Sequence, residues 1–344
     1  MYKVLVIRLS AIGDVAMTIP VVYDVAEANP QDSFYVLTQE FLLPLFINRP
    51  SNVHLLGMNT QSTERSLWRL IRYIFRLRRH KFDMALDLHN VIRSWMIDFL
   101  FYMSGKKVFR IDKGRKERKR LTRRPPKIID PLRQTTERYA DVFQAAGFHY
   151  EKKLVSLYDK NPVDEKLIEI MAGDRTGNWV GIAPFAKHKG KVYPIEKMVK
   201  VVEQLSEQGN VTLFLWGGRG EEADILERWA TKYKNTVNMA GRYPIDMELA
   251  LLNRLDALVS MDSANMHLSS LVGGRVISVW GATHPYAGFY GYCQRDDLAI
   301  QVDLPCRPCS IYGNKPCYRG DWACMQQILP EQITEKINKF LREK

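Results

Sequence analysis

The chain has 344 residues and a mass of 39.9 kDa, more than a single hydrophobic core usually supports, so we expect two domains. Hydrophobic residues make up 46% and charged residues 26% of the chain, which excludes disordered proteins, collagens and small disulfide scaffolds. The longest nearly apolar run, Trp95 to Met103, contains Asp98 and has half the length of a membrane-spanning helix. The apolar stretch at the N-terminus is too short for a signal peptide. We therefore expect a cytoplasmic protein.

The net charge of +12 is concentrated in one region of the chain. Residues 65–124 contain 19 lysines or arginines against 5 aspartates or glutamates, which leaves a net −2 for the rest. Such a region indicates a localised anionic partner: nucleic acid, an acidic membrane surface or an anionic substrate. A solvated basic surface without a partner is the alternative. A nucleic-acid-binding protein is the rival of a different class, but the region lacks an aromatic stacking platform and a recognition helix.

Short β-rich runs alternate with helical patterns in two stretches of the chain, which is typical of parallel sheets covered by helices. The expected strands of the first half are Val4–Ile7, Phe34–Leu37, Val53–Leu56, Met84–Leu88 and Val108–Ile111, with helices such as Pro20–Ala28 and Leu67–Arg79 between them. Those of the second half are Trp179–Pro184, Val211–Trp216, Ala257–Asp262, Val276–Trp280 and Leu298–Val302. Its helices are expected at Pro194–Glu207, Gly220–Tyr233, Met247–Asn253, Ala264–Val272 and Glu331–Leu341.

This pattern predicts an α/β protein with two Rossmann-like domains facing a cleft. We expect an N-terminal domain at 1–160 and a C-terminal domain at 175–330, joined by a polar linker within 151–178. The most charged segment, Lys113 to Arg124, is followed by two prolines and is expected to be a long mobile loop of the first domain.

Ligands of open parallel sheets bind beyond the carboxyl ends of the strands, so the strand-to-helix turns are the candidate sites. The first turn runs from Arg8 to Asp14, and Gly13 permits a tight turn there. Asp14 is either a helix N-cap or a carboxylate that acts as a general base. Neither a G-x-G-x-x-G nor a G-x-x-x-x-G-K-[ST] motif follows the first strand, which argues against a nucleotide-dependent oxidoreductase and a P-loop enzyme.

Three turns of the second half also carry polar groups suited to a nucleotide. Lys187, His188 and Lys191 lie between a strand and a helix, where a lysine cluster suits a diphosphate, although ordinary loop lysines are equally compatible. The Trp216-Gly217-Gly218 bend leads to Glu222, which is either a ribose ligand or a helix-start acid. The turn from Asp262 to His267 enters a helix whose N-terminus is a natural phosphate site, although many helices begin in this way without binding a ligand.

Four cysteines follow the spacing Cys306-x2-Cys309-x7-Cys317-x6-Cys324, and Cys293 is left over. A C-x-x-C start is compatible with structural zinc, but the second pair does not repeat it. Packed thiols are the other interpretation, since disulfides are rare in a reducing cytoplasm.

Taken in series, these motifs resemble glycosyltransferase family 9, the bacterial lipopolysaccharide heptosyltransferases and their relatives. The matching pieces in the first half are the opening segment from Val6 to Val15 with Thr18 and Pro20, then Leu86-Asp87-Leu88 and Arg93-Ser94. Those in the second half are Lys191-x-Tyr193-Pro194, Trp216-Gly217-Gly218, Asp262-Ser263-Ala264-x-x-His267, residues 280–285, and the cysteine segment up to Pro330.

The resemblance implies a GT-B fold with an acceptor-binding N-terminal domain, a nucleotide-binding C-terminal domain and a C-terminal helix, 331–344, that packs back on the first domain. It implies an inverting transfer of a heptose or similar sugar, without metal or cofactor, from a nucleotide-diphosphate sugar such as ADP-heptose. The expected acceptor is an anionic, lipid-linked saccharide of the lipopolysaccharide or lipooligosaccharide core. The enzyme would lie peripherally on the inner face of the inner membrane and would not bind nucleic acid.

The resemblance also implies roles for particular residues. It makes Asp14 the catalytic base and Lys191 the residue that contacts the donor diphosphate. The expected donor-binding residues are Lys187, His188, Glu222, Asp262, Ser263, Ala264 and His267. The expected acceptor-binding residues are Ser10, Gly13, His89, Arg93, Lys113 and Arg115.

The sequence departs from the family pattern at a few positions. Ala264 stands where the family usually has glycine, and Phe185-Ala186 stands where small hydroxyl residues are common. These departures leave the reaction class intact and leave open a relative that uses another nucleotide sugar and acceptor. A non-catalytic relative that binds nucleotide sugar is a further alternative, against which intact Asp14 and Lys191 weigh.

Overall fold

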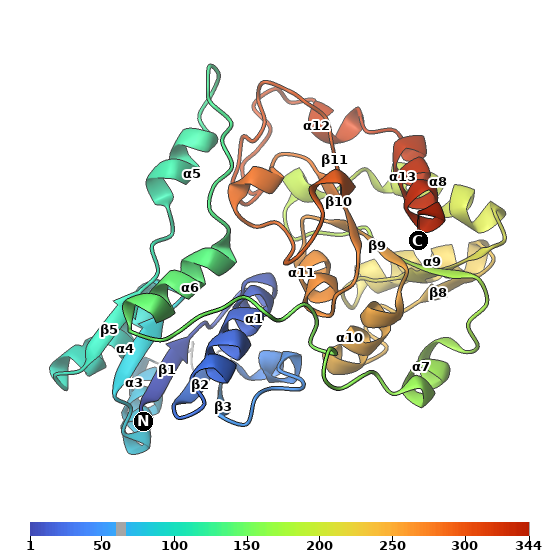
Figure 1. Ribbon diagram of the computed structural model, residues 1–344. Helices are drawn as coiled ribbons and strands as arrows, with labels where there is room; N and C mark the ends of the chain where they lie inside the picture. The colour runs from blue at the N-terminus through green and yellow to red at the C-terminus, as the bar shows by residue number, and fades with distance from the viewer. Residues whose placement is uncertain (60–66, 344) are drawn as a thin grey trace. The chain divides into compact units, whose positions relative to one another are not determined.

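The computed structural model describes residues 1–59 and 67–343 and divides into two units (Figure 1). Unit 1 comprises Met1–Lys113 and Thr135–Leu157, and unit 2 comprises Gly114–Gln134 and Tyr158–Lys344. Arg65, the first basic residue of the charged region, lies outside the described residues. Each unit contains one parallel sheet with helical crossovers, so the expected α/β class with two parallel sheets is confirmed.

The sheet of unit 1 has the strand order β3-β2-β1-β4-β5 within the described residues. Its strands are β1 (Lys3–Ile7), β2 (Ser33–Gln39), β3 (Val53–Met58), β4 (Met84–Asp87) and β5 (Lys107–Arg110). Its helices are α1 (Ile12–Ala28), η1 (Glu40–Leu45), α3 (Leu67–Leu77), η2 (Arg78–His80), α4 (Ile92–Met103) and α6 (Thr135–Ala145). The order reverses between β1 and β4, and open α/β sheets bind ligands beside such a switch point.

The sheet of unit 2 has the order β11-β10-β9-β6-β7-β8 within the described residues, with its switch point between β6 and β9. Its strands are β6 (Asn178–Ala183), β7 (Val211–Leu215), β8 (Thr236–Asn238), β9 (Ala257–Met261), β10 (Val276–Trp280) and β11 (Ala299–Gln301). Its α-helices are α5 (Arg115–Leu121), α7 (Glu165–Ala172), α8 (Ile195–Glu207), α9 (Glu221–Lys232), α10 (Ile245–Arg254), α11 (Ala264–Leu271), α12 (Ala323–Gln326) and α13 (Pro330–Arg342). Its 3-10 helices are η3 (Lys189–Lys191), η4 (Pro285–Ala287) and η5 (Asp296–Leu298).

The central strands are short apolar runs because both faces of a parallel sheet are covered by helices. Every residue of β9 and β10 is buried, and so are the last four of β1. Strand bounds agree with the expectations to within about two residues. The exception is β8, which was not predicted because three edge residues give no hydrophobic period.

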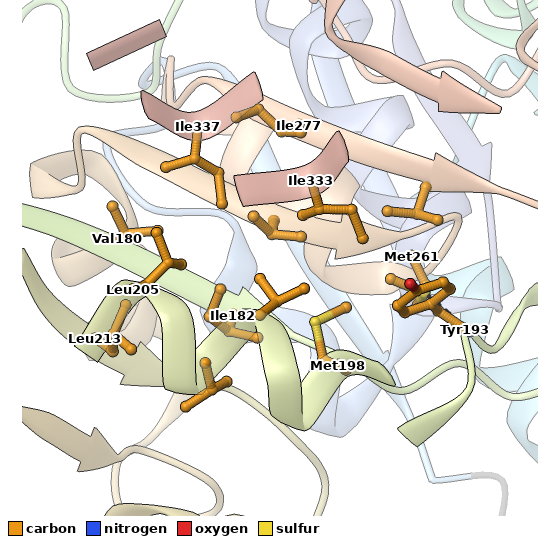
Figure 2. Packing of buried hydrophobic residues seen from close by; sticks show 14 of the residues in the cluster. Val180, Ile182, Tyr193, Met198, Leu205, Leu213, Met261, Ile277, Ile333 and Ile337 are labelled. Atoms are coloured by element: carbon orange, nitrogen blue, oxygen red, sulfur yellow. Dashed lines mark hydrogen bonds between the residues drawn. The ribbon is translucent and has the colours of Figure 1, made fainter. Parts of the chain in front are cut away.

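The core of unit 2 includes the C-terminal helix. Figure 2 shows Ile333 and Ile337 of α13 among the buried side chains of β6 and α8, such as Ile182 and Leu205. The structure thus places this helix in unit 2, whereas we expected it on the N-terminal domain. Its amphipathic face explains the placement, because that face completes the hydrophobic cover of the second sheet.

The segment 114–134 also differs from the expectation of a long loop of the first domain. It contains α5 and belongs to unit 2. Arg118 donates to the Tyr312 hydroxyl over 3.1 Å and stacks over the Phe289 ring, while Lys127 Nζ donates to the carbonyls of Cys306 and Pro308. Cation–π stacking and carbonyl acceptors therefore give this basic segment specific partners.

Two further corrections concern α1 and the linker. α1 begins at Ile12 and not at Pro20, which lies inside it. A helix tolerates proline at the loss of one hydrogen bond when packing holds it, and residues 15–26 of α1 are all buried. The expected linker, 151–178, contains α7, and the boundary between the units lies at residues 157 and 158.

Candidate active site

In unit 1, an ion pair lies at the carboxyl end of β1. Arg8 Nη2 lies 2.6 Å from Asp14 Oδ2, and the Arg8 side chain is 8% exposed against 27% for Asp14. Burial is the largest single influence and lowers the pKa of the Arg8 guanidinium, but Asp14, Tyr139 and Asp87 together raise it, and the net shift is upward. Asp14 also accepts the Ala11 N–H over 3.2 Å. The N-cap residue of α1 is Ala11 and Asp14 is the third residue of the helix, so the N-cap interpretation of Asp14 is wrong. The side chain of Asp14 binds back to the N-cap backbone and is still 27% exposed.

His89 follows β4 on the other side of the switch point. Burial and the positive charges of Arg8 and Lys113 lower its pKa to about 3. The imidazole is therefore neutral at physiological pH, and its Nδ1 is buried without a hydrogen-bond partner among the residues that the structure describes. A group with so low a pKa is a weak base, which leaves Asp14 as the candidate base of this cluster.

The loop that carries His89 is fixed by a buried carboxylate. Asp87 Oδ1 accepts the backbone N–H groups of His89 and Asn90, and Ser94 Oγ donates to Asp87 Oδ2 over 2.7 Å. Asp87 is completely buried. Arg8 Nη1 donates to the Leu88 carbonyl over 2.7 Å, which ties this loop to β1.

The other expected acceptor residues are only partly brought together. Ser10 precedes α1, and Gly13 lies within the first turn of α1 without a positive φ, so the expected tight turn at Gly13 is wrong. Lys113 Nζ donates to the Asn90 carbonyl over 3.2 Å, which places it beside the His89 loop. Arg93 is exposed on α4. Arg115 begins α5 of unit 2 and is not part of this cluster.

In unit 2, Lys191 and Asp262 meet across the switch point. Lys191 Nζ lies 2.9 Å from Asp262 Oδ2, and the side chains are 17% and 5% exposed. Lys191 comes from the loop after β6 and Asp262 directly follows β9, two strands that pair in the sheet. The pair joins two residues whose motifs are 71 positions apart.

The residues next to this pair come from the same two loops. Ser263 is the N-cap residue of α11, Ala264 is its first residue, and His267 is buried one turn further along. Lys187 is exposed in the β6–α8 loop. Burial lowers the pKa of His188, and the charges of Lys191 and Lys187 lower it further.

Glu222 belongs to the neighbouring loop after β7. Its Oε2 accepts the Gly218 N–H over 2.6 Å, so it holds the glycine bend. A Cβ on Gly217 would meet Phe185 of the β6–α8 loop at 3.3 Å, so the two loops lie against each other. The candidate donor residues thus lie on three loops that follow adjacent strands.

The cysteine segment packs around the Lys191 loop. Cys306, Cys309, Cys317 and Cys324 are free and line one small cavity. Burial raises the pKa of Cys324 to about 11. Within the residues that the structure describes, no group of three or more His, Cys, Asp or Glu side chains is arranged to hold a metal ion. Gly313 of this segment packs on the Lys191 stem, where a Cβ would lie 2.6 Å from Cγ.

Sequence reasoning missed Arg307, which organises the turn after β10. Its buried guanidinium donates to the carbonyls of Gly281, Thr283 and Trp280 over 2.6, 3.0 and 3.3 Å. Burial lowers its pKa. Its only sequence signal was a position between two cysteines. Arg8 was equally missed as a partner of Asp14, although it directly follows a strand.

No helix in the described part of the chain has the length and apolar character needed to cross a membrane.

Comparisons with known proteins concern the sequence and the fold. The family model described as "Glycosyltransferase family 9 (heptosyltransferase)" matches residues 68–316. The chain is 23% identical over 325 residues to lipopolysaccharide heptosyltransferase 1 of Pseudomonas aeruginosa, covering 89% of this chain and 86% of that protein. Its fold is similar to ADP-heptose lps heptosyltransferase II of E. coli, with a TM-score of 0.73, 17% identity and 99% of each chain covered. It is also similar to E. coli heptosyltransferase WaaC with ADP, with a TM-score of 0.68 and 16% identity over 98% of this chain and 99% of that one.

The family model covers more than half of the chain, and the solved structures share its two-sheet GT-B fold. The chain therefore belongs to glycosyltransferase family 9, the heptosyltransferase family.

Proposed function

We propose that this protein is an inverting, metal-independent transferase that moves heptose from ADP-heptose to an acceptor of the lipopolysaccharide or lipooligosaccharide core. Membership of family 9 supports the reaction class. The relatives named above are heptosyltransferases, and one of the similar structures contains ADP. The observation that carries the proposal is the Lys191–Asp262 pair at the switch point of unit 2.

On the donor side, Lys191 binds the diphosphate and the N-terminus of α11 adds the positive end of its helix dipole. The ammonium group is the more exposed member of its ion pair, so an anionic ligand reaches it without removing Asp262. Ser263, Ala264 and His267 form the turn that holds the nucleotide. Glu222 contacts the ribose with the oxygen that does not accept the Gly218 N–H. Lys187 and His188 flank the phosphates.

On the acceptor side, Asp14 takes the proton of the attacking hydroxyl. An inverting transfer requires a base on the face of the sugar opposite the leaving group. The neutral His89 ring orients the acceptor and does not compete for the proton, because its pKa is about 3. Ser10, Gly13, Arg93 and Lys113 of unit 1 complete the proposed acceptor contacts.

The leaving group explains why the proposal needs no metal or cofactor. The departing nucleoside diphosphate has a terminal phosphate pKa near ~6, so it leaves without a strong general acid. The negative charge that develops on it is stabilised by Lys191 and the α11 N-terminus. An anionic, lipid-linked acceptor would account for the basic region and for a peripheral position on the cytoplasmic face of the inner membrane.

Calorimetry tests the donor assignment. We would titrate ADP, UDP, GDP, CDP and NAD, each with and without EDTA, into the wild type and Lys191→Met. The control variant is Lys200→Met, an exposed lysine on α8. Selective ADP binding that resists EDTA and weakens only in Lys191→Met supports the proposal. Selective binding of another nucleoside diphosphate would identify a relative with a different donor, and binding of NAD alone would refute the transferase assignment.

Turnover tests the base. With ADP-heptose and a heptose-accepting core saccharide, Asp14→Asn should lose activity while ADP affinity stays unchanged. The anomeric configuration of the product, determined by NMR, decides whether the transfer inverts.

A further inference from the structure

The helix α4 exposes a continuous apolar stripe. Its exposed residues are spaced by three and four positions, which places them on one side of the helix. The stripe, called here the α4 stripe, has members between 43% and 73% exposed: Ile92, Trp95, Phe99, Tyr102 and Met103. Large exposed apolar patches on a soluble unit mark interaction surfaces.

The opposite side of α4 already supplies the core of unit 1. Ile97, Leu100 and Phe101 are buried in the cluster that includes Ile7 of β1 and Ala85 of β4. Asp98 is also buried and pairs with Arg110 over 2.6 Å. The α4 stripe is therefore not needed to close the hydrophobic core of the unit.

Cations surround the stripe. Arg110 stacks over the Tyr102 ring at 5.4 Å, and Arg93 is the single charged residue on the exposed side of α4. The neighbouring α3–η2 segment and its flank expose a row of basic side chains: Arg72, Arg76, Arg78, Arg79 and Lys81. In residues 67–111 only Asp83 is an exposed acid, because Asp87 and Asp98 are buried.

A cavity of about 420 Å³ lies between the C-terminal ends of α3 and α4. The α4 stripe, the exposed cations of α3 and η2, and this cavity are together called the α3–α4 surface. The apolar wall of the cavity comes from Leu77, Phe82, Leu100 and Phe101, and its basic residues are Arg78, Lys81 and Lys106. A hollow with apolar walls and cations fits an amphiphile that has an anionic head and a hydrocarbon tail. The helices carrying this surface, α3 and α4, are drawn in cyan tones in Figure 1.

We infer that the α3–α4 surface docks unit 1 on an anionic lipid bilayer. Ile92, Phe99 and Met103 enter the boundary of the acyl region, and Trp95 and Tyr102 lie at the headgroup level, where such rings are enriched. The arginines of α3 and η2 bind lipid phosphates. A bilayer fits this surface better than nucleic acid does, because the five apolar side chains of the α4 stripe would find no apolar partner on a phosphate backbone. This inference deepens the proposed function, whose acceptor is lipid-linked, but the binding it predicts needs no turnover.

Vesicle sedimentation with the full-length protein tests the inference. We expect binding to vesicles of phosphatidylcholine mixed with phosphatidylglycerol, little binding to phosphatidylcholine alone, and loss of binding as salt rises. Ile92→Ser with Phe99→Ser should weaken partitioning at least about tenfold. Arg72→Ala with Arg76→Ala should weaken it about thirtyfold, since each cation near the surface contributes roughly 1 kcal/mol.

Matched controls lie on unit 2. Ile128 and Ile170 are 78% and 76% exposed, so their double serine variant removes equally exposed apolar groups elsewhere. Lys166→Ala with Lys234→Ala removes two exposed cations. Both controls should bind vesicles like the wild type. Brominated lipids should quench tryptophan fluorescence in the wild type and quench it less in Trp95→Phe.

Three results would overturn the inference. They are absence of wild-type binding to anionic vesicles, equal losses in the controls, and a stripe variant that keeps vesicle binding but changes the oligomeric state in light scattering. The last would identify the stripe as a contact with a second copy. ADP binding should be unchanged in every variant, so failure of docking is distinguishable from failure of the proposed function.

Discussion

Removal of the Lys191 ammonium group gives the sharpest test of the donor site. Lys191→Met keeps the aliphatic stem, which packs against Gly313, and deletes the charge. A hydrogen bond between a charged donor and a phosphate contributes about 1.5–3 kcal/mol, so ADP affinity should fall roughly 10- to 150-fold. Nζ has three N–H groups, so it can bind Asp262 and a phosphate at the same time. We therefore expect its removal to weaken ADP binding itself.

The same variant should destabilise unit 2. It leaves Asp262, 5% exposed, without its cation at 2.9 Å, and breaking a buried pair from one side costs several kcal/mol. Asp262→Asn removes the unpaired charge, so the double variant should be more stable to urea than Lys191→Met alone. The assay is a double-mutant cycle with calorimetry for ADP and urea unfolding for stability. The reasoning is refuted if Lys191→Met binds ADP like the wild type, or if the two substitutions add without coupling.

Three more outcomes follow from single side chains. Asp14→Asn should lower kcat by about 10²- to 10⁴-fold, as steady-state kinetics would show, because a positioned base is lost; an unchanged kcat would reject Asp14 as the base. Arg307→Met should lower the free energy of unfolding by about 3 kcal/mol or more in urea titrations, because buried carbonyls lose their donor; equal stability would contradict the organising role of Arg307. Burial raises the pKa of Glu248 on α10 to about 7, so the folded state binds its proton more tightly and loses stability as pH rises from about 4.5 to 7. Glu248→Gln should therefore gain stability relative to the wild type between pH 5 and pH 8, measured as the shift in urea midpoint; the same shift at both values would disprove the assignment.

The strands could be predicted because each is a short apolar run that ends in a turn, and the parallel order follows from helical crossovers. No bounds were predicted from the sequence for α4, the helix between the fourth and fifth strands. Its exposed stripe and its buried side are both apolar. The sequence Ile92–Met103 therefore lacks the alternation of polar and apolar residues from which a helical period is recognised. The exposed apolar side that removes this contrast is also the side that we propose as a docking surface.

The site could be predicted in part for a similar reason. Asp14, Lys191 and Asp262 lie on turns at the carboxyl ends of strands, which topology alone brings to one edge of each sheet. Their partners could not be read from local sequence. Arg307 acts on carbonyls 24 to 27 positions away, and α5 finds its aromatic partners more than 170 positions along the chain. Such contacts depend on the packing of unit 2 and leave no periodic trace in the sequence.

The two ion pairs differ in which member faces solvent, and this difference fits the two proposed roles. In unit 1 the arginine is buried and the carboxylate is the exposed partner, 8% against 27%. In unit 2 the carboxylate is buried and the lysine is the exposed partner, 5% against 17%. A pair that presents its carboxylate can accept a proton from a hydroxyl, whereas a pair that presents its ammonium can bind a phosphate. Both pairs lie beside the switch point of a Rossmann-like sheet. The same topology therefore supports a base in one unit and a phosphate-binding cation in the other, and the difference is which member of the ion pair is buried.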